Sequence, residues 1–262
     1  MRALRTKRKA KTKVTRAKRE LLKIEGRTVE IILRANPRAR RFIVKVDPST
    51  GEVSVVAPSS RSLDRALDFA RKEKDWIADR LADIPAPVPL TLGAPILFRG
   101  VEHVIRLGER AAGDRRSGPV WIDRDSVRPT IRVSGHAEHA PRRVLDWLKR
   151  EARSRIDEKA AEYVQAVAVK AKRITIRDTT SRWGSCSSAR SLSFSWRLIL
   201  APPMVLDYVV GHEVCHLREM NHGPRFWRLV ETIIPNMEKP QGWLTENGAL
   251  LHRYAPRQRA FD

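Results

Sequence analysis

An H-E-x-x-H pattern inside a long apolar segment constrains this chain more than any other feature. The pattern is His212-Glu213-Val214-Cys215-His216, within the segment 203–220, whose apolar residues recur with helical spacing. On a helix the two histidines are about 40° apart in projection and about 6 Å apart along the axis, so both imidazoles can reach one ion. Glu213 lies one step around the helix, where it can accept a proton from water at that ion. The segment is therefore predicted to be a helix with a metal site on one face.

A third ligand is needed, because a catalytic zinc ion typically has three protein ligands and one open position. His222 follows His216 by six residues, and Asn221 just before it can end the helix in a left-handed conformation that turns the chain back toward the metal. The resulting spacing is that of metzincins, but Glu219 stands where those enzymes carry a turn glycine. The chain is therefore not a standard metzincin.

Zinc is the ion that this pattern favours, because imidazole ligands beside a glutamate base suit it. A carboxylate, Glu231 or Glu246, is the alternative third ligand. Zinc would lower the pKa of its bound water and polarise a carbonyl, while Glu213 accepts the water proton and passes one to the leaving amine. The predicted reaction is hydrolysis of a peptide bond or another amide bond.

A resemblance to a known family rests on residues 182–227, which read RWGSCSSARSLSFSWRLILAPPMVLDYVVGHEVCHLREMNHGPRFW. This segment resembles the YgjP-type metallopeptidase-like family of predicted metal-dependent hydrolases, which is related to SprT-like zincins. The order of strands and helices is similar over most of residues 28–250. The resemblance implies zinc ligands at His212, His216 and His222 and a catalytic acid/base at Glu213. It implies a type of reaction but no particular substrate.

The charge of the chain is unusual. Its 52 Lys and Arg residues against 30 Asp and Glu residues leave a net charge of +22. Residues 1–23 hold eleven of the cations and one acid, Glu20. Because such a run repels itself and has few apolar residues, we expect residues 1–25 to be a disordered tail. The tail either binds the phosphate backbone of a nucleic acid or serves solubility.

The remainder is predicted to contain a β-rich portion, residues 26–135, and a zincin-like portion, residues 136–262, although residues 26–250 could form one continuous domain. In the β-rich portion we expect a meander of three strands over residues 28–58, one helix from Ser62 to Leu81, and further strands up to residue 135. No internal repeat is visible in the sequence.

The zincin-like portion has the pattern of a long helix after Pro141, which spans about 28 residues. A strand at residues 174–178 and a hairpin-like pair over residues 182–200 follow, before the H-E-x-x-H helix. The fold class is therefore α+β, with a zincin-like core of long support helix, small sheet and active-site helix. A strand between Ser191 and Leu200 could bind an extended peptide by edge pairing.

Several further residues have expected roles around the site. Cys186 is a candidate fourth, inhibitory ligand, although a lone cysteine is more often a small buried side chain, and Cys215 should face the core. Asp207 could hydrogen-bond a ligating histidine or interact with the helix dipole. Arg218 or Tyr254 could stabilise an oxyanion. Aromatic side chains are expected to pack around the site; they are Trp183, Trp196, Phe226 and Trp227.

Three function classes follow, and zinc is the cofactor in each. The first is a zinc metallopeptidase or amide-bond hydrolase acting on a peptide or protein. The second is a nucleic-acid-associated zincin that acts on DNA-bound proteins. The third is a non-catalytic, zinc-containing nucleic-acid-binding module, against which Glu213 argues, because a structural site needs no base. Two cysteines suit a reducing compartment, so we expect the cytoplasm, and no apolar run is long enough to cross a membrane.

Overall fold

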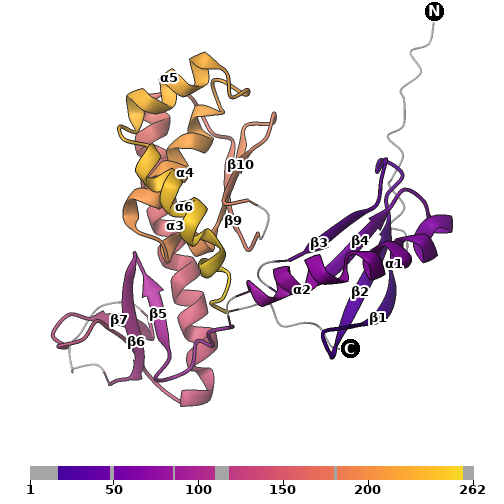
Figure 1. Cartoon of the computed structure of the whole chain (residues 1–262). Coiled ribbons are helices and arrows are strands. Elements are labelled where there is room, and N and C mark those ends of the chain that lie inside the picture. Colours follow the sequence, from indigo (N-terminus) through magenta and orange to yellow (C-terminus); the bar gives the residue numbers. More distant parts are fainter. Residues whose placement is uncertain (1–16, 48–49, 85, 110–117, 180–181, 256–262) are drawn as a thin grey trace, which may run out of the picture. The chain divides into compact units, whose positions relative to one another are not determined.

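A computed structural model describes residues 17–47, 50–84, 86–109, 118–179 and 182–255 (Figure 1). The chain divides into two compact units, Met1–Ile84 and Pro85–Asp262, here called the N-terminal and the C-terminal unit. Each has its own hydrophobic core. The fold is a mixture of helices and small sheets, as the α+β expectation requires.

The N-terminal unit is a four-stranded sheet with two helices. Its strands are β1 (Lys18–Ile24), β2 (Arg27–Ala35), β3 (Ile43–Val46) and β4 (Val53–Ala57), and its helices are α1 (Leu63–Lys72) and α2 (Lys74–Ala82), after the short 3-10 turn η1 (Ser60–Ser62). Alternate residues of β4 are buried, which is the pattern of a strand with one covered face. Ala66 and Ala70 of α1 and Ile77 of α2 complete the core on that face.

Three details of this unit differ from the sequence-based expectation. Residues 18–24 form strand β1, paired with β2, although they were expected to belong to a disordered tail. Leu22 and Ile24 give this basic strand an apolar side that packs into the core. The strand order is β1-β2-β4-β3 with β2 and β4 parallel, so the sheet is not a meander. The expected single helix is broken at Glu73 into two.

The C-terminal unit begins with a second four-stranded sheet, of order β5-β6-β8-β7. Its strands are β5 (Pro95–Phe98), β6 (Val101–Leu107), β7 (Val120–Asp123) and β8 (Thr130–Val133), followed by the 3-10 turn η2 (Ala137–His139) and helix α3 (Ala140–Ala166). The length of α3, 27 residues, confirms the long helix predicted after Pro141. Every fourth residue of α3 is fully buried; these residues are Val144, Leu148, Ala152, Ile156 and Ala160.

The second sheet and the helices that follow it share one core within the C-terminal unit. Ile105 and Ile131 of the second sheet belong to the same buried cluster as Leu148 of α3 and Val210 of the H-E-x-x-H segment. Because α3 packs against the sheet through one half and against the remaining elements through the other, it joins them into one unit.

The remaining elements surround the far half of α3. They are β9 (Arg173–Arg177), β10 (Gly184–Cys186), β11 (Ser191–Ser195), the 3-10 turn η3 (Trp196–Ile199), α4 (Pro203–Cys215), α5 (Pro224–Ile233) and α6 (Glu238–Leu251). The strand order is β10-β11-β9, with β11 in the centre. None of the helices in the described ranges combines the length and hydropathy that a membrane span requires.

A buried arginine connects η3 to the C-terminal end of α6 and the residues just after it. The side chain of Arg197 is fully buried, and its guanidinium donates hydrogen bonds to the backbone oxygens of Leu251, Tyr254 and Ala255 and to the carboxylate of Asp178. A buried guanidinium is tolerated only when its donors are satisfied in this way. The segment after α6 is therefore fixed to the residues that lead into α4.

Candidate metal centre

Helix α4 presents two histidines at its C-terminal end. His212 lies in the last turn, and His216 is the residue at which the helix ends, still in right-handed conformation. The two ring centroids are 5.0 Å apart. The spacing of four residues thus places both imidazoles on one side of the helix, as expected from the sequence.

The chain then reverses without a left-handed residue. The backbone N–H of Glu219 donates to the carbonyl of Cys215 at 2.9 Å, and that of Gly223 to Asn221 at 2.7 Å. Asn221 is not among the residues with positive φ, so its expected left-handed turn is wrong. The helix ends five residues earlier than predicted, which leaves enough chain for a reversal by ordinary turns.

Glu219 contributes its backbone to the site. Its carbonyl oxygen lies 3.1 Å from Nδ1 of His216. This contact requires the proton of the imidazole on Nδ1, and it leaves the lone pair of Nε2 free. The residue that stands in place of a metzincin turn glycine therefore orients a histidine.

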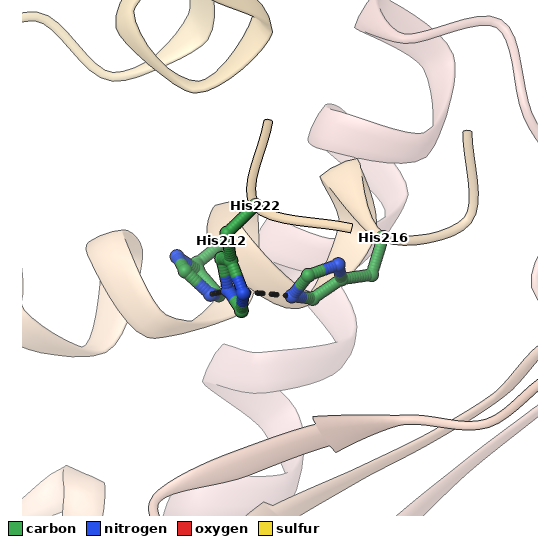
Figure 2. A group of neighbouring side chains, drawn as sticks. All are labelled: His212, His216 and His222. Atoms are coloured by element: carbon green, nitrogen blue, oxygen red, sulfur yellow. Dashed lines mark hydrogen bonds between the residues drawn. The ribbon is translucent and has the colours of Figure 1, made fainter. Parts of the chain in front are cut away.

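The three histidines of the sequence pattern meet in space (Figure 2). Nε2 of His222 is 3.1 Å from Nε2 of His212 and 3.1 Å from Nε2 of His216. One ligand nitrogen from each residue lies within 4.8 Å of the others. A proton on Nε2 of His222 can satisfy only one of its two neighbours, so this cluster of lone pairs fits a divalent cation that prefers imidazole. In the part of the chain that the structure describes, Glu231 and Glu246 do not belong to this group.

Phe226 of α5 packs against all three histidines of the cluster. It is fully buried, and its ring stacks on His216 with centroids 4.4 Å apart. The rings of His212 and His222 meet it edge to face at 4.9 and 4.8 Å. One apolar side chain thus contacts all three imidazoles and restricts their rotation.

Glu213 is held against strand β10. Its side chain is buried, and this burial raises the pKa of the carboxyl group to about 7, against the opposing effects of Arg182 and of a hydrogen bond from the backbone N–H of Cys186. A Cβ atom on Gly184 would lie 2.5 Å from Cγ and 2.8 Å from Oε1 of Glu213. Only glycine at position 184 therefore leaves room for the carboxylate where it is.

With this geometry established, comparison with known proteins identifies the family. A sequence profile described as the YgjP-like metallopeptidase domain matches residues 40–247 of the chain. The chain belongs to the YgjP-like family. No curated protein matches it. Among solved structures, the metallopeptidase zymogen of Pyrococcus abyssi abylysin aligns with 35% of this chain and 93% of its own, at 16% identity and a TM-score of 0.32.

Membership in this family makes the chain a metallopeptidase-type hydrolase, whose chemistry requires a metal ion. The histidine triad is the group of described residues that could hold one. The YgjP-like match spans parts of both units, from β3 in the N-terminal unit to α6 in the C-terminal unit.

Two residues beside the triad, Gly184 and Arg182, had no predicted role in the sequence, and Cys186 was expected to act through its thiol and not through its backbone N–H. All three act on Glu213. The only sequence signal for them was their presence in the R-W-G-S-C segment that carried the family resemblance. Neither periodicity nor spacing could indicate that β10 would pack against α4.

Other residues expected near the YgjP-like site have different partners. The thiol of Cys186 contacts the carbonyl of Ser187 at 3.6 Å, and the histidine cluster of the described residues does not include it. Cys215 is fully buried in the core, as predicted. Asp207 lies 3.7 Å from Nζ of Lys159, and in the described ranges no hydrogen bond or ion pair joins it to a histidine of the triad. Nδ1 of His212 is buried without a hydrogen-bond partner among the described residues.

The two oxyanion candidates are also engaged elsewhere. Nη1 of Arg218 donates to the carbonyl of Val167 at 3.3 Å, and Tyr254 is buried and bridged to Val88. Of the expected aromatic residues, Trp227 contacts His222 with centroids 5.6 Å apart, whereas Trp183 stacks on His252. The prediction of aromatic packing around the site thus applies to the two residues of α5.

The strand that was expected to bind a peptide, β11, does not lie at an edge of its sheet. β11 is hydrogen-bonded to β10 on one side and to β9 on the other, so it has no free edge within its pairing range. β10 is an edge strand, and a Cβ atom on its Gly184 would clash with Glu213.

Proposed function

We propose that the chain is a zinc-dependent peptidase in which His212, His216 and His222 hold the ion and Glu213 is the general base. The observation that carries the proposal is the convergence of three Nε2 lone pairs next to a buried carboxylate on the same helix. Three imidazoles favour zinc over cations that prefer oxygen ligands. The core that positions them, namely α3 as support, the sheet of β9 to β11, and α4, is proposed to be zincin-like.

When bound, the ion would supply Lewis-acid activation of a water molecule and of the scissile carbonyl. Glu213 would accept a proton from that water at its carboxylate and donate it to the leaving amine. The Cys186 N–H and Gly184 hold the carboxylate in place, and Phe226 restricts the rotation of the imidazoles.

An extended peptide is the proposed substrate. Apart from the Cys186 N–H that Glu213 accepts, the outer edge of β10 offers backbone groups beside Glu213, and an added strand would run along the site. Both cysteines are unpaired, which suits the reducing cytoplasm, and we propose this location.

The central experiment compares Glu213→Gln with the unchanged protein on a diverse peptide library. We expect the variant to keep its metal and its fold, because glutamine preserves the shape of the side chain, while hydrolysis falls about 10³-fold or more through loss of the base. Metal content by elemental analysis and cleavage by mass spectrometry measure both. Hydrolysis at the native rate would refute the role of Glu213.

A second experiment assigns the third ligand. His222→Ala should lower zinc affinity strongly, because it removes one of three ligands, whereas Glu231→Gln and Glu246→Gln should keep one zinc per chain. Titration against a chelating zinc indicator measures the affinities. Native affinity in His222→Ala together with loss in a glutamate variant would move the ligand to that glutamate.

A further inference from the structure

The N-terminal unit carries a groove between strand β3 and the helices α1 and α2. It has a volume of about 710 Å³, and its lining includes Arg41, Phe42, Ile43, Phe69, Glu73 and Trp76. The side chain of Trp76 is 40% exposed and that of Ile43 is 36% exposed. Large apolar side chains that line a hollow and remain accessible are typical of a binding surface.

The segment that leads into Arg41 of this lining is strongly basic. The connection between β2 and β3 carries Arg38, Arg40 and Arg41, all exposed, and Lys45 follows on β3. The sequence has no acidic residue between Ala35 and Val46. In the described ranges no ion pair joins these three arginines to a carboxylate, and Glu73 is the acid in the groove lining. Such a basic segment attracts a polyanion.

The aromatic rings add a second kind of recognition. Phe42 is fixed between Phe69, with ring centroids 5.8 Å apart, and the guanidinium of Arg65 at 5.9 Å. Arg80 lies 5.6 Å from the ring of Trp76, which stays partly open to solvent. Accessible rings beside backbone-binding cations are the arrangement with which proteins bind unpaired nucleotides, because every base can stack on an aromatic face.

We propose that this groove binds single-stranded nucleic acid, with phosphates at Arg38, Arg40 and Arg41 and a base stacked on Trp76. A duplex would offer the phosphates but keep its bases paired, and an acidic peptide would offer charge without bases. The proposal is independent of the hydrolase chemistry, since the groove lies wholly within the N-terminal unit.

The test measures fluorescence anisotropy of labelled probes with the full chain. The probes are a single strand of about 20 nucleotides, its duplex, and a polyglutamate peptide of similar charge. We expect the single strand to bind more tightly than the other two. Trp76→Ala should weaken single-strand binding at least about fivefold and leave duplex binding unchanged, and Trp76→Phe should restore most of the loss.

The arginines are tested with a matched control. Arg38, Arg40 and Arg41 are changed together to serine, and the control changes Arg106, Arg124 and Arg128, which are exposed in the C-terminal unit, in the same way. We expect the first variant to flatten the dependence of log affinity on log salt by about 2 units, since each lost phosphate contact contributes about 0.7. The control should change it little, and circular dichroism should verify that all variants are folded.

Three results would overturn the proposal. Equal losses in the arginine variant and its control would make the effect one of net charge. Native single-strand affinity in Trp76→Ala would exclude stacking. Polyglutamate binding as tight as that of the single strand would indicate a site for acidic proteins.

Discussion

The two four-stranded sheets have the same topology but different surroundings. Each begins with a hairpin whose two turn residues both have positive φ, Glu25-Gly26 in one and Arg99-Gly100 in the other. Each continues with a parallel pairing of its two central strands, an antiparallel fourth strand, a 3-10 turn and a helix. Ile31 follows the first turn and Ile105 follows the second by the same number of residues, and both are fully buried.

The surroundings of the two turns show how one motif serves two purposes. In the C-terminal unit the N–H groups of Arg99 and Gly100 donate to the carbonyls of Ile199 and Leu200, just before α4. A Cβ on Gly100 would lie 2.9 Å from Cγ of Pro202. No described atom would meet a Cβ on Gly26 within 4 Å. One hairpin thus holds the residues that lead into α4, whereas the other leaves its surface open.

The strongest test of this comparison is a matched pair of glycine substitutions. Both glycines have a left-handed φ, so alanine costs about 1 kcal/mol at either position. Gly100→Ala must also displace the backbone of Pro202, so we expect its free energy of unfolding to fall by about 2–4 kcal/mol. Denaturant unfolding followed by tryptophan fluorescence suits the C-terminal unit, which holds six of the seven tryptophans. Hydrogen exchange measures the stability of the N-terminal unit in Gly26→Ala. Equal losses of unfolding free energy in the two variants would contradict the difference between the two hairpins.

A second substitution tests the elements that the C-terminal unit has in addition to its four-stranded sheet, here the contact between β10 and α4. Gly184→Ala should move the Glu213 carboxylate, and a displacement near 1 Å can lower catalysis about a hundredfold. The atoms that clash with the added Cβ belong to Glu213 and not to the histidines, so zinc content should stay native. Gly242→Ala, where a Cβ meets no described atom within 4 Å, is the control. Native activity in Gly184→Ala would mean that the strand does not position the base.

The smallest expected effect concerns the tail. Strand β1 begins at Lys18, so a deletion should stop at residue 16 to keep the N-terminal sheet intact. Residues 1–16 hold eight cations and no acid. If the tail adds a few phosphate contacts to the groove, its deletion should flatten the salt dependence of single-strand binding by about 1–2 units. An unchanged salt dependence would assign the tail to another role.

The local features of this fold could be predicted, and the long-range ones could not. Helical periodicity indicated α3, and ligand spacing singled out His222, because both depend on residues close in sequence. The parallel pairing of β2 with β4 and the contact of Gly184 with Glu213 join residues that no pattern connects. The repeated topology was hidden because the two copies share burial positions more than residue identities.

The buried side chain of Arg197 has a consequence for the order in which the protein forms during synthesis. Its guanidinium donates hydrogen bonds to the carbonyls of Leu251, Tyr254 and Ala255, which follow it in the sequence by 54, 57 and 58 residues. A growing chain exposes this arginine long before those carbonyls exist. The N-terminal unit has its strands and helices within 84 residues and can fold on the ribosome. The C-terminal unit cannot satisfy this guanidinium until residues 251–255 have been synthesised.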